Sequence, residues 1–309
     1  MEISITILKF LLCTLLVLII LTGVILAVFR AGGWMTFRKP EAEIRDAMEN
    51  SGLVLRFQET RPGLSGSISY LSATKQDRDS VPDLGILFVH GSPGAKDAFL
   101  PYLKEERLLS RAMLYAMDRP GFGYSGFGKA EPSLKEQAAR LIEVVREIGE
   151  DRVLLVGHSF GCAVIARAAM DFPGEMDGIH LIAGTIAPEA EPHNWWRKIV
   201  DLPVISGLLP VALVTCNREM LPLKSELQLM LPSWNRITCP VTLVHGTSDW
   251  IVNFRNLPLT SERLTHAKNL RAVTLKGEGH MILWQRKELM VDEIIKTISM
   301  IVGGSASDK

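Results

Sequence analysis

A serine lies between two glycines at a point where the sequence pattern changes. A run rich in valine and leucine precedes the motif Gly157-His158-Ser159-Phe160-Gly161, and small residues suited to a helix follow it. This order predicts a strand, a sharp turn and a helix, with Ser159 at the tip of the turn. The two glycines allow the strand and the helix to approach closely, because neither carries a Cβ atom.

A serine hydroxyl is a weak nucleophile and needs a base, a carboxylate behind the base and donors for an oxyanion. Asp249 follows the predicted strand 241–245, and His280 follows the predicted strand 270–275. Both residues therefore lie where the carboxyl ends of parallel strands meet. The chain order Ser159, Asp249, His280 is the order expected when the serine occupies such a turn. We predict that Ser159 is the nucleophile, His280 the general base and Asp249 the residue that orients the base.

Two backbone N–H groups are candidates for binding an oxyanion. Phe160 begins the predicted helix, so its N–H has no carbonyl acceptor in a preceding turn. The second candidate is the N–H of Ser92, in the loop from His90 to Gly94. This loop is rich in glycine and proline and follows an apolar strand, so it is expected to turn backbone N–H groups towards the same edge of the sheet.

Several neighbouring residues have other interpretations. Glu189 and Glu278 follow strands and are alternative acids to Asp249. Asp118 also follows a strand, but its position in a glycine-rich loop indicates a structural aspartate that holds the loop backbone. His90 and His245 end strands and are expected to pack or hydrogen-bond locally.

Alternating strands and helices must position these loops. The sequence predicts strands at 85–90, 113–117, 152–156, 178–184, 241–245 and 270–275, and the continuous apolar runs at 85–90 and 178–184 are typical of strands buried on both faces. Helices are expected at 40–51, 98–110, 133–148, 160–171, 261–267 and 284–301. Period-two alternation at 53–60 and 67–73 predicts an antiparallel hairpin. The alternation predicts an α/β fold with a mostly parallel central sheet and helices on both faces.

The alternation breaks between Thr185 and Ile237, where no strand pattern is present. This stretch contains several prolines, three tryptophans and a long apolar run at 202–216. We predict a helical cap, inserted at about 185–237 after the sixth strand and lying over the strand ends. Such a cap would exclude water and shape the substrate pocket.

The chain begins with an uncharged apolar segment, residues 10–29, which is long enough to span a bilayer as a helix. No small-residue cleavage motif follows it, so an uncleaved membrane anchor is expected rather than a cleaved signal sequence. The predicted organisation is an anchor at 1–30 and a catalytic domain at 31–309. One basic residue precedes the segment and four follow it: Lys9, then Arg30, Arg38, Lys39 and Arg45. This count favours the cytoplasmic side for the domain.

Composition excludes several other classes of function. The 309 residues include 34 lysines and arginines and 34 aspartates and glutamates, so no net charge favours a nucleic-acid partner. The four cysteines form no Cys-x-x-Cys motif, and neither a disulfide framework nor a zinc site is predicted. A bridge between Cys216 and Cys239 remains compatible with the sequence.

Five motifs in order resemble the α/β-hydrolase fold family over residues 50–302. They are HGSPG at 90–94, DRPGFGYSG at 118–126, GHSFG at 157–161, HGTSDWIV at 245–252 and GEGH at 277–280. The resemblance implies a serine hydrolase with oxyanion donors at Ser92 and Phe160 and without a metal or cofactor. HGSPG is also similar to the HGGPG motif of proline iminopeptidases, but the following loop differs. Serine in place of aspartate at the turn separates the chain from haloalkane dehalogenases and epoxide hydrolases.

The predicted function is therefore a membrane-tethered serine hydrolase that cleaves an ester or thioester through an acyl-enzyme intermediate. The expected substrate is a small-molecule ester or a lipid-like ester. A peptidase or a carbon–carbon bond hydrolase with the same triad is the alternative. A non-catalytic binding protein that retains the fold is the third possibility.

Overall fold

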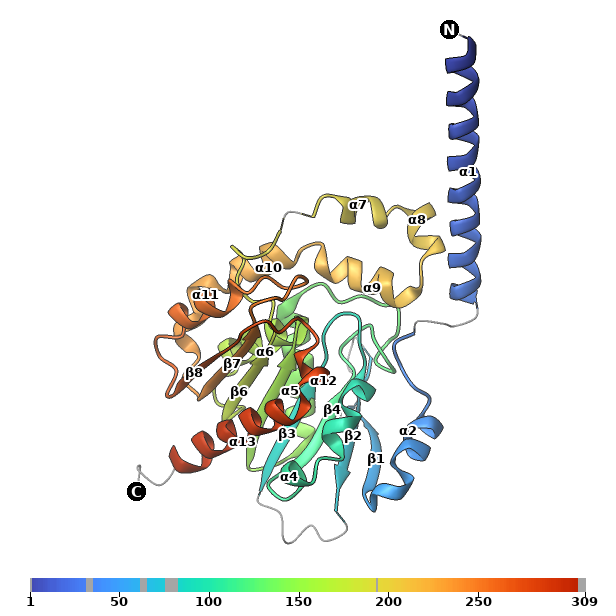
Figure 1. The fold of residues 1–309 in the computed structure, drawn as a ribbon. Coiled ribbons are helices and arrows are strands. Elements are labelled where there is room, and N and C mark those ends of the chain that lie inside the picture. The colour runs from blue at the N-terminus through green and yellow to red at the C-terminus, as the bar shows by residue number, and fades with distance from the viewer. Residues whose placement is uncertain (1, 32–35, 62–65, 76–82, 193, 305–309) are drawn as a thin grey trace.

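An eight-stranded sheet forms the centre of the protein (Figure 1). The computed structural model describes residues 2–31, 36–61, 66–75, 83–192 and 194–304. The strand order is β1-β2-β4-β3-β5-β6-β7-β8, and all neighbouring pairs from β4 to β8 are parallel. The strands are β1 Val54–Glu59, β2 Ser69–Thr74, β3 Leu84–Val89, β4 Met113–Met117, β5 Arg152–His158, β6 Gly178–Ile182, β7 Val241–Gly246 and β8 Leu270–Leu275. This mostly parallel sheet confirms the predicted α/β-hydrolase fold.

Strands β1 and β2 pair antiparallel at one edge of the sheet, as predicted for the hairpin. Residues 62–65 of the connection between them lie outside the described part of the chain. Helices surround the sheet: α2 Glu41–Met48, α3 Leu100–Leu103, α4 Glu106–Leu109, α5 Leu134–Ile148, α6 Phe160–Asp171, α11 Asn256–Arg263, α12 Ile282–Gln285 and α13 Lys287–Gly304. Single-turn 3₁₀ helices lie at η1 Glu49–Ser51 and η2 Lys96–Phe99.

Three predicted helices have different bounds in the structure. The helix expected at 98–110 is divided into η2, α3 and α4. Pro101 has no N–H to continue a helical ladder from η2, and Glu105 has extended dihedrals that separate α3 from α4. The helix expected at 261–267 lies earlier, at Asn256–Arg263, where the Asn253 side chain accepts a hydrogen bond from the Arg255 N–H. The last helix is interrupted at Arg286, which has non-helical dihedrals.

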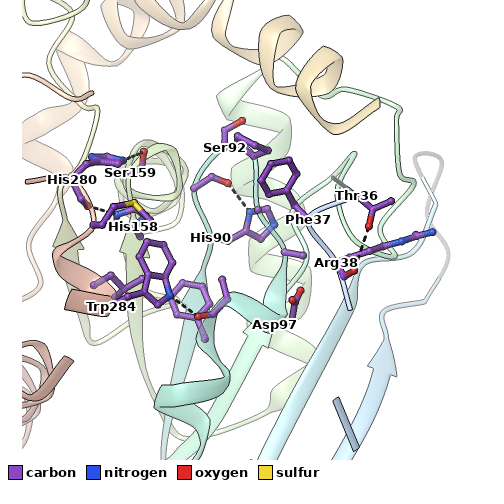
Figure 2. Close-up of a pocket in the computed structure, with 18 of the residues that line it drawn as sticks. Thr36, Phe37, Arg38, His90, Ser92, Asp97, His158, Ser159, His280 and Trp284 are labelled. Carbon is purple, nitrogen blue, oxygen red and sulfur yellow. Dashed lines mark hydrogen bonds between the residues drawn. The ribbon is translucent and has the colours of Figure 1, made fainter. Parts of the chain in front are cut away.

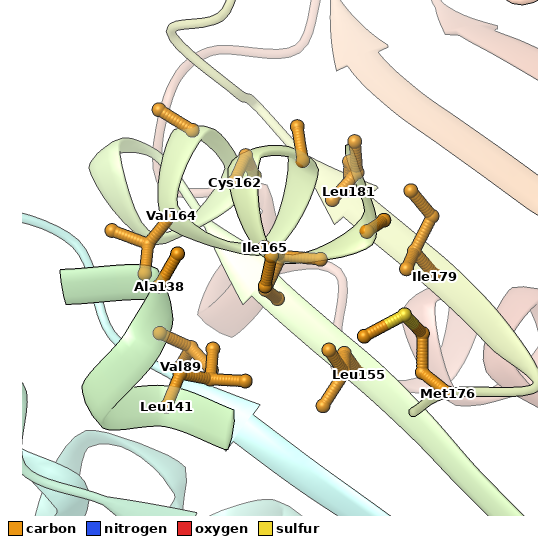
Figure 3. Close-up of a cluster of buried hydrophobic side chains, with 14 of the residues drawn as sticks. Val89, Ala138, Leu141, Leu155, Cys162, Val164, Ile165, Met176, Ile179 and Leu181 are labelled. Carbon is orange, nitrogen blue, oxygen red and sulfur yellow. The ribbon is translucent and has the colours of Figure 1, made fainter. Parts of the chain in front are cut away.

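Apolar side chains alternate between the two faces of the sheet and form two buried layers. Val153 and Leu155 of β5 pack with residues of α5 and α6, and Figure 3 shows Leu155 in this cluster. Leu154 and Val156 of the same strand belong to the opposite layer, with residues of α3, α4 and α13. Because β5 is buried on both faces, it is held firmly in the middle of the fold.

Glycines allow α6 to lie unusually close to the strands. A Cβ atom on Gly161 would lie 2.4 Å from the Val89 carbonyl oxygen at the end of β3. A Cβ atom on Gly157 would lie 2.8 Å from Ile165 Cδ1 in α6. The structure therefore gives both glycines of the motif a packing reason, and this close approach sets the position of the turn between them.

Four helices and one 3₁₀ helix lie between β6 and β7, over the carboxyl ends of the strands (Figure 1). They are α7 Trp196–Val200, α8 Pro203–Leu208, α9 Val211–Met220, α10 Leu223–Met230 and η3 Leu231–Arg236. The first of them begins eleven residues after the predicted start at Thr185, because the described residues 185–192, 194 and 195 contain no helix.

The N-terminal helix α1, Glu2–Ala31, projects from the rest of the protein and runs beside α8 (Figure 1). Its segment Ile7–Val28 has a mean hydropathy of 3.1 and is long enough to cross a membrane. Large apolar side chains along this segment are exposed, so the helix is not a buried core element.

We expect Gly161→Ala to destabilise the protein by about 2–3 kcal/mol, because the new methyl group collides with two backbone carbonyls that cannot move independently. Thermal unfolding of the full chain in detergent measures the effect, expected as a fall in Tm of several degrees. Gly174→Ala is the matched control, since a Cβ atom there has open space around it. Equal Tm values for the two variants would contradict the packing argument.

A second prediction concerns pH and the buried His180 of β6. Its Nδ1 pairs with Thr297 Oγ1 at 2.8 Å, and burial lowers its pKa to about 3. The unfolded chain, with a histidine pKa of about 6.5, therefore binds a proton between pH 6.5 and 3 that the folded chain does not bind. The free energy of unfolding must rise with pH in this window, by up to about 1.4 kcal/mol per pH unit for this group.

His180→Asn is expected to flatten this slope, as measured by urea unfolding between pH 4 and 6.5. The exposed His266→Asn is the control. An unchanged slope in the His180 variant would show that this histidine is protonated in the folded protein.

Candidate active site

Ser159 occupies a strained backbone conformation at the tip of the turn between β5 and α6. Its φ is 55° and its ψ is −121°, a combination that non-glycine residues rarely adopt. The surrounding sheet fixes this conformation, because the Ser159 N–H donates to the Ile182 carbonyl of β6 at 2.9 Å. The turn points the hydroxyl towards the loops at the carboxyl ends of the strands.

The structure brings the three predicted triad residues together. The Ser159 hydroxyl lies 3.0 Å from His280 Nε2, and His280 Nδ1 lies 2.8 Å from Asp249 Oδ2 (Figure 2 shows the serine–histidine pair). With Nδ1–H donating to the carboxylate, Nε2 is free to accept the serine proton. All three side chains are buried among the strand-end loops, with exposures below a tenth.

The Asp249 carboxylate is held in an ionised form. Burial raises its pKa, but hydrogen bonds from His245, His280 and the Val252 N–H outweigh burial and hold the pKa well below its usual value. Its Oδ1 accepts from the N–H groups of Ile251 and Val252 at 2.9 and 2.8 Å. These bonds fix the carboxylate in one orientation, which in turn fixes the imidazole of His280.

The two alternative acids lie elsewhere. Glu189 forms an ion pair with Arg263 at 2.6 Å, and Glu278 forms one with Arg286 at 2.6 Å. Both carboxylates are therefore engaged by arginines rather than by the candidate base. The geometry favours Asp249 over both of them.

His158, inside the turn motif, has a function that the sequence does not reveal. Its Nε2–H donates to the backbone carbonyl of His280 at 3.0 Å. Its ring contacts the His280 ring in a tilted arrangement and the Trp284 ring edge to face. Burial and the neighbouring His280 lower the pKa of His158 to about 3, so it stays neutral. His158 thus holds the backbone of the candidate base in place.

The two candidate oxyanion donors flank Ser159. Phe160 is the first residue of α6, so its N–H points out of the helix start towards the turn. The loop that carries Ser92 lies against the serine, since a Cβ atom on Gly91 would be 2.9 Å from Ser159 Cβ. Ser92, Ser159 and His280 all line the same cavity.

A buried ion pair ties this loop to the cap, and sequence reasoning did not find it. Arg119 pairs with Glu219 of α9 at 2.8 Å, and both side chains are fully buried. Arg119 also donates to the carbonyls of His90 and Gly91 at 2.8 and 3.0 Å, while the Ser92 hydroxyl donates to Glu219. No charge pattern along the chain signals this pair, because its members are 100 residues apart.

Two strand-end residues have the structural roles expected of them. His90 accepts the Arg119 N–H at Nε2 and faces the Gly91 carbonyl with Nδ1. Burial and the Arg119 guanidinium hold the pKa of His90 well below its usual value. Asp118 is fully buried, pairs with Lys96 and accepts the Tyr124 N–H at 2.9 Å, so it holds its own loop.

A cavity of about 760 Å³ opens beside Ser159 and His280 (Figure 2). Most of its lining is apolar, with Phe99, Leu213, Met281, Leu283 and Trp284 contributing large side chains. A volume of this size accommodates a substrate considerably larger than an acetyl ester.

Four residues of the segment that follows α1 in the sequence also line this cavity, which was not predicted. Thr36, Phe37, Arg38 and Lys39 lie along one wall, and Phe37 is drawn beside Ser92 and His90 in Figure 2. Arg38 fixes this segment to the loop after β4, because it donates to the Gly123 carbonyl at 2.7 Å. The only sequence signal was the position of these residues directly after the apolar helix.

Solved structures of several hydrolases are similar to this chain. A membrane phospholipase A described as a bacterial virulence factor matches with a TM-score of 0.61 and 19% identity, over 95% of this chain and 98% of that chain. A peroxisomal alpha-beta-hydrolase from Saccharomyces cerevisiae matches with a TM-score of 0.64 and 11% identity, over 82% of this chain and 88% of that chain. A 2-hydroxy-6-oxo-6-phenylhexa-2,4-dienoate hydrolase from a Rhodococcus species matches with a TM-score of 0.59 and 18% identity, over 79% of this chain and 99% of that chain. At these identities the likeness concerns the fold.

One curated relative is 32% identical over 126 residues: the dihydrolipoyllysine-residue acetyltransferase component of an acetoin cleaving system from Cupriavidus necator. The match covers 41% of this chain and 33% of that protein, so the chain spans about a third of the length of this relative. The model of the Alpha/beta hydrolase family matches residues 86–293, which include every candidate residue of the triad and the oxyanion site. The chain therefore belongs to the alpha/beta hydrolase family.

Proposed function

We propose that the protein is a serine hydrolase that cleaves carboxylic esters with lipid-like acyl chains while α1 anchors it in a membrane. One observation carries the catalytic part of this proposal. The imidazole of His280 bridges the Ser159 hydroxyl and the Asp249 carboxylate, at 3.0 and 2.8 Å. This is the arrangement that nucleophilic catalysis by serine requires.

Acylation begins when Ser159 Oγ attacks the ester carbonyl and His280 Nε2 accepts the hydroxyl proton. The negative charge then moves to the carbonyl oxygen, where the N–H groups of Ser92 and Phe160 stabilise it. Asp249 stabilises the imidazolium that forms and keeps its proton on Nδ1. Collapse of the tetrahedral intermediate breaks the ester bond, and His280 returns its proton to the departing alcohol.

Deacylation repeats the same steps with water as the nucleophile. His280 removes a proton from water, the hydroxide attacks the Ser159 ester, and the proton returns to Ser159 Oγ as the acid leaves. The same donors stabilise the second oxyanion. A thioester substrate would follow the same course with a thiol as leaving group.

The cavity supports an acyl substrate over a peptide. Its walls near Ser159 consist mainly of aromatic and aliphatic side chains, and Lys39 and Arg38 lie at the end formed by the segment after α1. An apolar chain gains by leaving water in such a cavity, at about 0.8 kcal/mol for each buried CH₂ group. A polar peptide backbone would leave its hydrogen-bonding groups unpaired there.

The membrane part of the proposal depends on α1. Segment Ile7–Val28 has the length and hydropathy of a membrane span, and its large apolar side chains have no protein cover. Basic residues that follow the span favour a cytoplasmic domain.

The alternatives use the same triad and differ in substrate. A panel of aryl esters of increasing chain length, aminoacyl amides and dienone acids separates an esterase from a peptidase and from a carbon–carbon bond hydrolase. A non-catalytic binding protein would hydrolyse none of them and would not react with a fluorophosphonate.

We expect Ser159→Ala to abolish labelling by a fluorophosphonate probe and to lower kcat by at least about 10⁴-fold, because the variant has no nucleophile. In-gel fluorescence after labelling, together with ester hydrolysis, measures both effects. Ser299→Ala on the surface of α13 is the control and should label as the wild type does. Persistent labelling of the Ser159 variant would rule out the proposed nucleophile.

Asp249→Asn tests which acid orients the base. An amide cannot stabilise imidazolium and can select the wrong tautomer, so kcat should fall by about 10⁴-fold with little change in KM. Glu189→Gln and Glu278→Gln are matched controls from the two other strand-end acids and should keep kcat within a few-fold. A larger loss in either glutamate variant than in the aspartate variant would reassign the acid.

A further inference from the structure

The first part of the cap exposes an unusual number of large apolar side chains. Residues 195–208 comprise α7, α8, the residue before α7 and the link between the two helices. Six of these fourteen residues are large, apolar and exposed: Trp195, Trp196, Ile199, Leu202, Val204 and Leu208. Val204 is 79% exposed and Trp195 is 65% exposed, although both belong to an ordered helical region. Apolar surface of this kind in one place indicates a binding face.

Helix α8, one end of this surface, lies directly beside α1, the helix proposed to cross the membrane (Figure 1). A Cβ atom on Gly23 of α1 would lie 3.6 Å from Leu208 Cδ1, an ordinary packing distance. Gly23, Leu26 and Ala27 are partly covered, whereas their neighbours on the other sides of α1 are exposed. Their spacing of three and four residues places them on one face of α1, towards α8.

The contact fixes the depth of α8 relative to the apolar span. Gly23 lies five residues before Val28, the last residue of the span. At 1.5 Å per residue, α8 touches α1 about 7–8 Å inside the end of the span. A segment packed at that level of a membrane-spanning helix lies within the outer part of the hydrocarbon layer.

We propose that residues 195–208 of the cap insert into the lipid bilayer that α1 crosses, as an interfacial element that does not span it. This proposal rests on the proposed membrane anchor. Because α8 packs against the membrane-spanning part of α1, we assign a bilayer rather than a protein as the partner that covers this surface. A soluble partner could not cover Leu208 and Val204 while lipid surrounds the neighbouring turn of α1.

The charged residues of this segment fit the surface of a membrane. Arg197 and Lys198 lie beside the tryptophans, and the Arg197 guanidinium stacks 4.6 Å from the Trp196 ring. Tryptophan and basic residues together are typical of the membrane–water interface. Asp201, the one acidic residue of the segment, is paired with Arg218 at 2.8 Å, so its charge is compensated.

Insertion would place the catalytic cavity next to the lipid. Residues that follow each membrane-facing segment line the cavity, namely Thr36 to Lys39 after α1 and Leu213 after α8. A lipid ester would then move from the leaflet into the cavity without crossing water. Substrate supply from the bilayer, rather than from solution, follows from this arrangement.

Depth-dependent fluorescence quenching tests the proposal on the full chain. An NBD label is attached to Val204→Cys in a background with Cys13, Cys216 and Cys239 changed to serine; Cys162 is buried and can stay. The protein is reconstituted into phosphatidylcholine vesicles with and without lipids that carry a nitroxide on the acyl chain. Leu229→Cys on α10 is the matched control, with an exposed leucine of the same cap.

We expect the label at 204 to be quenched at least about threefold more than the label at 229. A separate variant keeps Cys13, has Cys216 and Cys239 changed to serine and carries no cysteine at 204; a label on its Cys13, within the span, reports on the anchor itself. Quenching at Cys13 but not at 204 would overturn the inserted cap and leave the anchor intact. No quenching at Cys13 would overturn both the anchor and the inserted cap, whereas fluorophosphonate labelling of Ser159 would remain as evidence of catalysis.

A charge placed on the surface gives a second, functional readout. Val204→Glu should lower the rate of hydrolysis of an ester embedded in vesicles by about tenfold, because a carboxylate at that depth is costly. Hydrolysis of a short water-soluble ester should not change, since the Val204 side chain is exposed and is not among the residues that line the cavity beside Ser159. Leu229→Glu is the control for both assays. Equal losses in the two variants, or a loss on the soluble ester, would contradict insertion of residues 195–208.

Discussion

The close contact between α6 and the ends of β3 and β5 is the constraint on which the site depends. Gly161 lies so near the Val89 carbonyl that no side chain fits between them, and the chain must turn sharply at Ser159. The resulting φ of 55° is unfavourable for serine and persists because the buried layers on both sides of β5 hold it. The stability of the core thus maintains the strained geometry that directs the hydroxyl towards His280 and the cavity.

The candidate base is fixed by three side chains, two from the turn after β5 and one from the loop after β7. Asp249 after β7 binds Nδ1 of His280, Ser159 after β5 faces Nε2, and His158 binds the backbone carbonyl. Burial keeps His158 neutral, while converging donors keep Asp249 ionised. Burial favours the neutral form of both side chains: it prevails at His158, whereas hydrogen bonds to the carboxylate outweigh it at Asp249.

Apolar surface has two separate uses in this molecule. Within the cavity it lines the space beside Ser159, and on α1 and the start of the cap it faces outward. The segment Thr36 to Lys39 connects the two, because it follows α1 and forms a cavity wall, held by Arg38 on the Gly123 carbonyl. The buried Arg119–Glu219 pair provides a second connection, from the cap to the loop of Ser92. The proposed membrane contact and the proposed entry of substrate would therefore depend on connected parts of the fold.

The sequence alone determined the order of strands and helices, the turn at Ser159 and the loops that carry Asp249 and His280. Local rules suffice for these features, since period, glycine placement and strand-end position act over a few residues. The helix boundaries predicted from the sequence were wrong near Pro101, Asn256 and Arg286, where single residues interrupt or shift a helix. Only the tertiary structure decided which acid faces the base and that Arg119 pairs with Glu219. It also decided that Phe37 lines the cavity and that α8 packs beside α1. These contacts join residues far apart in the chain, and their partners are selected by packing rather than by any local pattern.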